Sequence, residues 1–342
     1  MKPSETFCRE ILPEVSRTFA LTIPVLPAPL DLAVTVAYLL CRIADTLEDE
    51  ARGDLAEREA LFRELARLTS LPPDWREATP AFVQRTIAVV SEQAPQPEVQ
   101  LLKGTAQVLQ SLAGLPAWTH GHIARCLAVM TGGMAASARA LEGRAGPAGL
   151  ANLEATLSYC YYVAGVVGEM LTGMFIEYDR EVASRREALV PRSAAFGRAL
   201  QLTNILKDIR KDLERGTCWL PADRLAAWGL SPATLAEPAQ RHKAVALLNE
   251  LVSVARNEAD IAFEYALALP SSQPGLRLFC LWPLFLAVLT LAALEGNPAV
   301  FDRAPVKIGR DAVQAILLAA QEAVGSDEAL RSLYFQKRGR PS

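Results

Sequence analysis

Two segments of this sequence would be apolar on nearly every face if they were helical. Residues 32–44 are apolar apart mainly from Tyr38 and Arg42, and a group of carboxylates follows directly. Residues 158–175 have the same character and carry three glycines in their interior. A helix that is apolar all round belongs in the centre of a protein. Interior glycines cost about 1 kcal/mol each relative to alanine, so three of them indicate close packing or room for a ligand.

The rest of the chain favours an all-α architecture. Stretches rich in Ala and Leu recur between Pro and Gly clusters, whereas two-residue alternation with β-branched residues is nearly absent. No connection is long enough for an interdomain linker, so we expect one helical domain over residues 1–342. Helices are predicted at about residues 29–50, 55–69, 80–90, 99–112, 121–141, 153–175, 192–215, 244–268, 276–294 and 309–323.

Composition and charge narrow the class of protein. The net charge is −3, which argues against a nucleic-acid partner held by a basic field. Six cysteines without CxxC or CxC spacing argue against a zinc ribbon, and buried free thiols in a reducing cytoplasm are the simplest interpretation. The uncharged apolar stretch at residues 278–294 is shorter than the roughly 20 residues that span a bilayer, so we expect a buried core helix there.

Carboxylates occur at helical spacing at the ends of two apolar helices. Asp45, Glu48 and Asp49 stand at i, i+3 and i+4 and would share one helix face. Asp208 and Asp212 repeat the i, i+4 spacing on a second helix. Mg²⁺ is typically bound by one or two carboxylates together with substrate phosphates, so the two motifs together indicate a metal–diphosphate site. The alternative is a solvated acidic surface with local salt bridges.

Basic residues accompany both motifs. Arg42 lies one helical turn before the first motif, Lys207 directly precedes the second, and Arg17 lies near the N-terminus. A diphosphate in an apolar cavity needs a metal ion and Arg or Lys side chains to offset its charge. Departure of diphosphate from an allylic carbon leaves a carbocation, which an apolar wall protects from water and aromatic faces stabilise.

These residues resemble the squalene/phytoene synthase family of head-to-head prenyl transferases. The first acidic motif matches the family's Asp-x-x-Glu-Asp, with Tyr38 and Arg42 upstream of it. The most specific match is Tyr-Cys-Tyr-Tyr-Val-Ala-Gly-Val-Val-Gly, which begins at Tyr159. Further matching segments are residues 16–19, 130–135 and 201–208, and the resemblance ends near Arg310. It implies the all-α isoprenoid synthase bundle with a central apolar cavity, in agreement with the helical pattern.

Within the family, the sequence resembles squalene synthases more than phytoene synthases. Residues 279–301 resemble the C-terminal helix of squalene synthases, and Val306-Lys307-Ile308 resembles their NADPH phosphate segment. The resemblance implies that two farnesyl diphosphates condense to presqualene diphosphate, which NADPH reduces to squalene. It implies no obligate protein partner, and the prenyl substrate leaves room for peripheral membrane contact during product release.

The resemblance also implies a role for each matched residue. Asp45, Glu48, Asp49, Asp208 and Asp212 would hold Mg²⁺; Arg17, Arg42, Lys207, Asn204 and Gln201 would grip the diphosphates; Lys307 and Arg310 would bind NADPH; Tyr159 would take or relay the proton lost during cyclopropane formation; and Phe19, Tyr38 and Phe279 would shield the cationic intermediates.

Three positions depart from the family pattern. Lys211 replaces an acid of the second motif, and Lys207 replaces an Arg, so the bidentate phosphate geometry of the Arg is lost. The family's Lys-x-Arg appears here as Lys307-Ile308-Gly309-Arg310, with the Arg one residue further along the chain. A dehydrosqualene- or phytoene-type synthase, or one that stops at presqualene diphosphate, would need no nicotinamide. The non-enzyme alternatives are a catalytically silent prenyl-lipid-binding protein and a helical protein with plain acidic faces.

Overall fold

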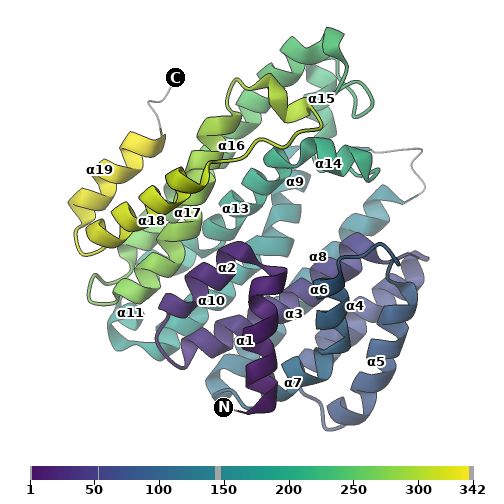
Figure 1. Ribbon diagram of the computed structural model, residues 1–342, viewed down its shortest axis with the longest axis vertical. Helices are drawn as coiled ribbons and strands as arrows, with labels where there is room; N and C mark the ends of the chain where they lie inside the picture. The colour runs from purple at the N-terminus through teal and green to yellow at the C-terminus, as the bar shows by residue number, and fades with distance from the viewer. Residues whose placement is uncertain (1, 53, 143–147, 339–342) are drawn as a thin grey trace. The chain divides into compact units, whose positions relative to one another are not determined.

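Every regular element is a helix in the residues that the computed structural model describes, which are 2–52, 54–142 and 148–338 (Figure 1). Within this part of the chain, the β-type pairings are two isolated bridges, Ala51 with Val90 and Leu150 with Pro221. The all-α class predicted from the sequence is confirmed. The chain divides into two compact units, Met1–Arg139 with Glu169–Ser184, and Ala140–Gly168 with Arg185–Ser342. The predicted single domain stays a prediction.

The first unit is organised around one buried helix, α3. It packs against α1, α4, α6 and α7, and Leu39, Leu40 and Ile43 are fully buried on it. This agrees with a central helix that is apolar on all sides. The elements of the unit are α1 Pro3–Val15, α2 Arg17–Thr22, η1 Ile23–Val25, α3 Leu30–Glu50, α4 Leu55–Thr69, α5 Trp75–Val89, α6 Gln96–Lys103, α7 Thr105–Ala113, α8 Ala117–Leu141 as far as residue 139, α10 Val166–Tyr178 from residue 169, and α11 Arg180–Ser184.

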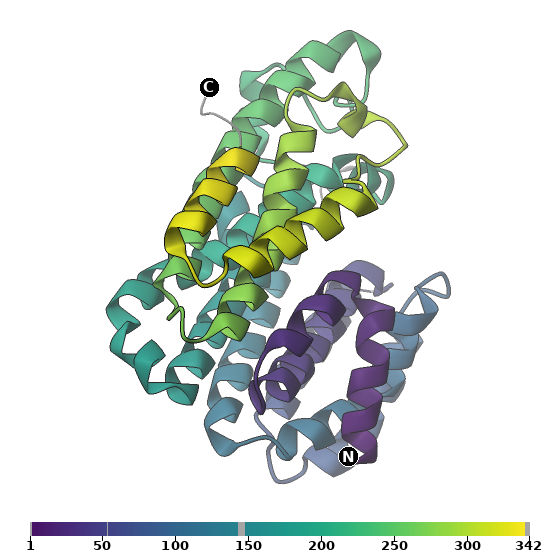
Figure 2. The ribbon, with the colours of Figure 1, turned by 60° about the vertical axis from the view of Figure 1, so that its left-hand side comes forward.

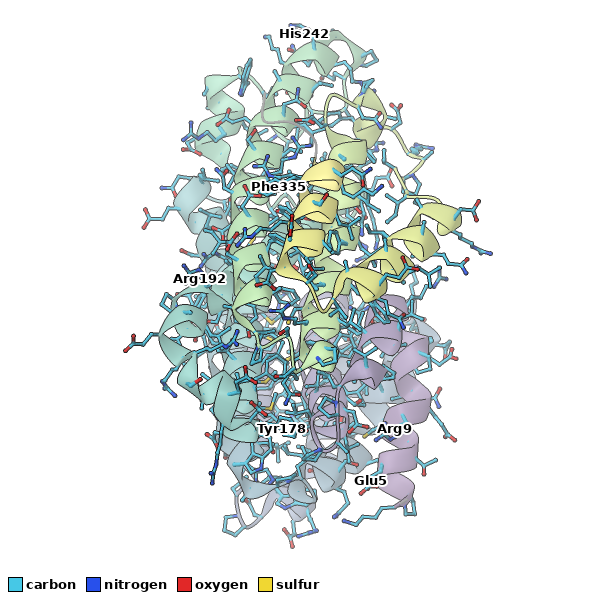
Figure 3. All side chains as sticks on the ribbon, turned by 90° about the vertical axis from the view of Figure 1, so that its left-hand side faces the viewer. Glu5, Arg9, Tyr178, Arg192, His242 and Phe335 are labelled. Carbon is cyan, nitrogen blue, oxygen red and sulfur yellow. The ribbon has the colours of Figure 1, made fainter. Side chains whose placement is uncertain are left out.

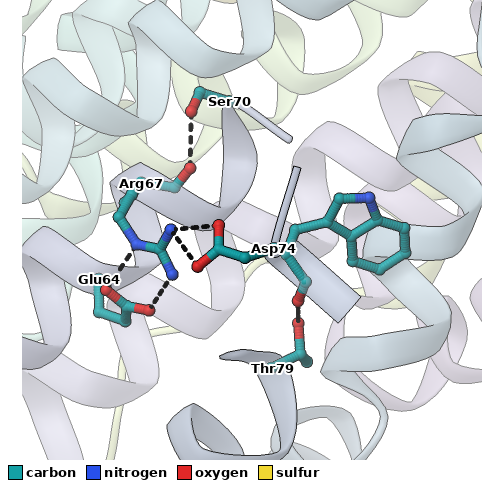
Figure 4. Close-up of polar contacts among 6 residues, drawn as sticks. Glu64, Arg67, Ser70, Asp74 and Thr79 are labelled. Carbon is teal, nitrogen blue, oxygen red and sulfur yellow. Dashed lines mark hydrogen bonds and ion pairs between the residues drawn. The ribbon is translucent and has the colours of Figure 1, made fainter. Parts of the chain in front are cut away.

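An arginine joins the end of α4 to the start of α5 (Figure 4). The Arg67 guanidinium donates to both oxygens of Glu64 and to both oxygens of Asp74, at 2.8–3.1 Å. Asp74 directly precedes Trp75, the first residue of α5, and its carbonyl accepts from Ala78 N at 3.0 Å. The helix predicted to begin at residue 80 therefore begins five residues earlier, because the first turn is closed before the proline.

The second unit surrounds another apolar helix, α17. It packs against α13, α16, α18 and α19, which Figures 1 and 2 show beside it. The elements are α9 Leu153–Cys160, the π-helical turn η2 Tyr161–Gly165, the first three residues of α10, α12 Arg186–Leu189, η3 Val190–Arg192, α13 Ser193–Lys207, α14 Ile209–Glu214, α15 Ala222–Ala227, η4 Pro238–Gln240, α16 Arg241–Ala268, α17 Pro274–Leu294, η5 Pro298–Phe301, α18 Arg310–Ala323 and α19 Asp327–Arg338.

Two helical stretches are long and apolar enough to cross a membrane, Leu153–Tyr178 and Pro274–Leu294, and 61% of the apolar window of each is buried inside the protein. In α17, Leu281, Leu284 and Phe285 are fully buried. Four helices of the same unit cover α17, which favours the predicted core helix over a membrane span.

Several predicted helices are interrupted in the structure. The prediction for 99–112 is divided at Gly104, where a Cβ atom would lie 2.0 Å from the Phe7 ring. The prediction for 153–175 contains the π-helical turn η2, and that for 192–215 is divided at Asp208. Helices α1, α2, α11, α12, α15 and α19 were not predicted. The polar helix α19 buries Tyr334 and exposes 57% of Phe335, which Figure 3 labels.

The glycines inside the segment 158–175 permit close packing. A Cβ atom on Gly168 would lie 2.0 Å from the Ser193 carbonyl oxygen, a backbone atom that has little freedom to move. A Cβ atom on Gly173 would lie 2.5 Å from the His122 ring. Close packing, one of the two predicted explanations, is therefore confirmed at both positions.

We expect Gly168→Ala to lower the midpoint of urea unfolding, with a loss of roughly 1–3 kcal/mol, because overpacking forces a backbone shift. Gly121 on α8 is the matched control, since a Cβ atom there would meet nothing within 4 Å. Gly121→Ala should be neutral or stabilise by up to about 1 kcal/mol through helix propensity. Equal midpoints for the two variants would contradict the close approach.

Candidate functional site

The first acidic motif lies in the last two turns of α3. Asp45 and Glu48 are half-buried and Asp49 is exposed, whereas the neighbouring Ala44 and Leu47 are fully buried. The carboxylates therefore occupy the less buried side of a helix whose other sides are core. This is the arrangement on one face that the i, i+3, i+4 spacing predicts.

The surroundings of Asp45 change the pKa of its carboxyl group. Burial raises the pKa of its carboxyl to about 7; Arg42 opposes this effect, while Asp49 and Glu98 add to it. The side chain nevertheless keeps 37% of its surface exposed, so the protein surrounds the carboxyl without sealing it from water. Arg42 alone does not offset the effect of burial, and a bound cation would favour the ionised form of the carboxyl.

Arg42 is held by a carboxylate that the sequence analysis did not find. Its Nη2 donates to Oε1 of Glu98, on α6, at 2.7 Å, whereas its Nη1 lies 3.9 Å from Oδ2 of Asp45. The guanidinium thus lies between two carboxylates of the first unit. No local pattern could reveal Glu98, because 56 positions separate it from Arg42 in the sequence.

An aromatic pair lies near the start of the first unit. The Phe19 and Tyr38 ring centroids are 5.0 Å apart, with 40° between the ring planes. Ser16 Oγ accepts from Phe19 N at 3.1 Å and caps α2, which begins at the exposed Arg17. Burial raises the pKa of Tyr38, whose hydroxyl donates to the Val15 carbonyl at 3.4 Å. The Ser-Arg-Thr-Phe segment is therefore positioned by a helix cap.

The second acidic motif lies at the junction of α13 and α14. Asp208 occupies the junction, and its carbonyl accepts from Asp212 N at 2.9 Å. Lys207 Nζ lies 3.4 Å from Oδ2 of Asp208 and 3.4 Å from Oδ1 of Asn204. The two carboxylates are therefore one turn apart, and a cation already lies beside the first of them.

Tyr159 is buried at the end of α9, with 4% of its surface exposed. Its ring stacks on Trp219, with centroids 4.0 Å apart and planes 6° from parallel. The sequence analysis missed Trp219. The feature that could have drawn attention to Trp219 is its position in a short connection, seven residues after Asp212.

The remaining predicted residues lie in the second unit. Gln201 is half-buried on α13, and Phe279 is buried on α17. Lys307 and Arg310 are both exposed, in a segment without regular structure and at the first position of α18. Two cations beside a helix N-terminus fit the phosphate of a nucleotide.

The predicted residues fall into two sets. The first unit holds Arg17, Phe19, Tyr38, Arg42, Asp45, Glu48 and Asp49; the second holds Tyr159, Gln201, Asn204, Lys207, Asp208, Asp212, Phe279, Lys307 and Arg310. Within the units, the structure brings Arg42 close to Asp45, Phe19 close to Tyr38, and Lys207 close to Asn204 and Asp208.

The carboxylates of the two acidic motifs fit Mg²⁺ that is held partly by substrate phosphates better than they fit a metal ion held by protein side chains alone. Among the described residues, no group of three or more His, Cys, Asp or Glu side chains is arranged to hold a metal ion. Mg²⁺ keeps several water ligands and is usually held by one or two carboxylates plus phosphate oxygens. Asp45, with its raised pKa, fits such a partial site.

We expect Mg²⁺ to bind about tenfold more weakly at pH 6 than at pH 8, because a carboxyl with a pKa of about 7 is mostly protonated at pH 6. Since this pKa is raised, the group's contribution to stability falls as the pH rises from about 4 to about 7 in EDTA. Thermal unfolding followed against MgCl₂ concentration at both pH values tests this. The same dependence of the thermal midpoint on MgCl₂ at pH 6 and at pH 8 would contradict the prediction. Asp45→Asn should abolish the difference between the two pH values.

Comparison with known proteins agrees with the all-α fold and with the family that the motifs resemble. The squalene/phytoene synthase family matches residues 12–311 of this chain. The probable squalene synthase of Neurospora crassa is 28% identical over 320 residues, which are 93% of this chain and 62% of that protein. The 15-cis-phytoene synthase of Enterobacter agglomerans is 41% identical over 130 residues, 38% of this chain and 39% of that protein.

A solved structure, the complex of TcSQS with the ligand E5700, has a TM-score of 0.80 and 25% sequence identity, and the match covers 98% of this chain and 91% of that one. The chain shares its all-α fold with this structure, and the family that it matches consists of prenyltransferase-type enzymes. The chain belongs to the squalene/phytoene synthase family. It spans about three fifths of the length of the squalene synthases that it matches.

Proposed function

We propose that this protein is a squalene synthase that condenses two molecules of farnesyl diphosphate to presqualene diphosphate and reduces this product with NADPH to squalene. The observation that carries the proposal is Asp45: a carboxyl with a raised pKa, beside Arg42, at the end of an apolar helix. A diphosphate with Mg²⁺ would supply an anion for Arg42 and a second cation for Asp45.

The two acidic motifs would each bind a diphosphate through Mg²⁺. Asp45, Glu48 and Asp49 form one motif, and Asp208 and Asp212 form the other. When bound, Mg²⁺ would act as a Lewis acid that stabilises the departing diphosphate. Arg17, Arg42, Lys207, Asn204 and Gln201 would orient the phosphate oxygens, and Lys211 would contribute a direct lysine–phosphate contact.

The aromatic residues would act on the prenyl chain. Phe19 and Tyr38 form a pair in the first unit, and Phe279 is buried in the second. Their faces would stabilise cationic intermediates, and the apolar surroundings would exclude water. Tyr159 would take or relay the proton lost as the cyclopropane forms, with released diphosphate as the final base.

NADPH use is supported by Lys307 and Arg310, which are exposed at the start of α18 and would bind the nucleotide phosphate. A cytoplasmic location, with peripheral membrane contact during product release, is part of the proposal. The second candidate is a synthase that stops before reduction. The phytoene synthase among the relatives favours it.

The test is to incubate the purified protein with farnesyl diphosphate and Mg²⁺, with and without NADPH, and to identify the extracted products by mass spectrometry. Squalene formed only with NADPH is the expected result, and Lys307→Ala/Arg310→Ala should then leave presqualene diphosphate. Dehydrosqualene, or presqualene diphosphate alone in both reactions, would overturn the reductive step. No turnover of farnesyl or geranylgeranyl diphosphate would favour the prenyl-lipid-binding alternative.

A further inference from the structure

The stack of Tyr159 on Trp219 joins two distant parts of the second unit. Tyr159 lies in the last turn of α9, and Trp219 lies in the connection between α14 and α15. Rings 4.0 Å apart and 6° from parallel leave the tyrosine no room to rotate on that side. The contact therefore restricts the direction in which the phenol oxygen of Tyr159 points.

Two hydrogen bonds, one from a side chain and one within the backbone, attach the connection that carries Trp219 to α9 and to the segment before it. The Trp219 carbonyl accepts from Thr156 Oγ, one turn before Tyr159, at 3.3 Å. Three residues after Trp219, Ala222 N donates to the Leu150 carbonyl at 2.7 Å. The connection is thus attached both to α9 and to the segment that leads into it.

The same connection begins at the second acidic motif. Gly216, with φ +80°, reverses the chain after α14, and Thr217 N donates to the Asp212 carbonyl at 2.9 Å. Cys218, the neighbour of Trp219, is buried. Burial raises the pKa of the Cys218 thiol to about 11, and the charge of Asp212 adds to this effect. Trp219 therefore lies in a short path from Asp212 to Tyr159.

We propose that Trp219 is a positioning residue for Tyr159, which holds the phenol in the orientation required for proton transfer and couples it to the second acidic motif. The inference rests on the proposed function, because it concerns the step assigned to Tyr159. Trp219 itself touches no reacting atom in this proposal. Its effect should appear in kcat, which depends on alignment, rather than in KM.

Trp219→Leu removes the aromatic face and keeps an apolar side chain. We expect kcat for farnesyl diphosphate to fall on the order of 10- to 100-fold, the size expected for a misplaced catalytic group, with KM changed by less than about threefold. Trp219→Phe restores a ring and should recover most of kcat. The near-ultraviolet circular dichroism of the stacked pair should be lost in the Leu variant and partly kept in the Phe variant.

Phe263→Leu is the matched control. Phe263 on α16 stacks on Tyr334 with nearly the same geometry, 4.0 Å between centroids and 9° between planes, in the same unit. This substitution should lower the thermal midpoint without separating kcat from KM. If Trp219→Leu does not fold, Trp219→Met replaces it, because the longer, unbranched methionine side chain adapts better to the gap that the indole leaves.

The outcomes separate the inference from the proposed function. An active parent protein, a specific loss of kcat in Trp219→Leu and its recovery in Trp219→Phe would support the inference. An active parent in which Trp219→Leu behaves as Phe263→Leu does would overturn the inference alone. An inactive parent would overturn the proposed function and the positioning role with it.

Discussion

Asp45→Asn is expected to lower kcat/KM for farnesyl diphosphate about a thousandfold at saturating Mg²⁺, which corresponds to about 4 kcal/mol of lost transition-state stabilisation. An amide keeps the shape of the carboxylate and loses its charge, so it holds Mg²⁺ far less well. Burial already disfavours the ionised form of Asp45. The neutral variant should therefore be at least as stable as the parent in EDTA, which separates the loss of activity from misfolding.

Asp31→Asn is the control for this experiment. Asp31 lies near the start of the same helix and pairs with Arg9 at 2.7 Å, remote in sequence from the acidic motif. Its replacement should change kcat/KM by less than about twofold, because Asp31 lies nearly four helical turns before Asp45 on α3. Steady-state kinetics over a range of MgCl₂ concentrations measure both variants. Activity of Asp45→Asn within tenfold of the parent would exclude Asp45 as a metal ligand.

The sequence predicted the features that local interactions determine and missed those that depend on contacts between distant residues. Helix α4 begins and ends where it was predicted, because Asp54 caps it locally by accepting from Glu57 N at 2.7 Å. Helix α3 also agrees to within one residue, because its apolar pattern is strong. Helix α19 was missed because it is mostly polar. It is held by tertiary contacts, in which Tyr334 stacks on Phe263 and donates to Asp260.

The same distinction applies to the site. Motifs within one helix, such as Asp45 to Asp49, were visible in the sequence, and the structure places them on one side of α3 as expected. The partners that hold the predicted residues were not visible. Glu98 reaches Arg42 from another helix, and Trp219 reaches Tyr159 through a chain reversal at Gly216. Neither pairing has a local signature, so only the folded chain reveals it.

Arg277 shows how strongly one such contact can stabilise the fold. It lies on α17 with 2% of its surface exposed. Nε and Nη2 donate to the carbonyl oxygens of Leu269 and Leu267, at 2.8 and 3.1 Å, where α16 ends. Nη1 donates to the Val324 carbonyl at 3.2 Å and to Oδ1 of Asp327 at 2.7 Å, between α18 and α19. One guanidinium therefore satisfies acceptors at the ends of three helices.

Arg277→Met is expected to destabilise the second unit by about 3–5 kcal/mol, because buried carbonyl groups lose a charged donor while methionine keeps most of the volume. Hydrogen exchange measured by mass spectrometry should show lost protection in α18 and α19, and the urea midpoint should fall. Arg331→Met is the control, since Arg331 pairs with Glu264 across α19 and α16 while both side chains are 45% exposed. That exposed pair should contribute less than about 1 kcal/mol. Equal losses in the two variants would show that burial of Arg277 adds nothing, whereas the expected difference would show that Arg277 holds the C-terminal helices more strongly than an exposed ion pair does.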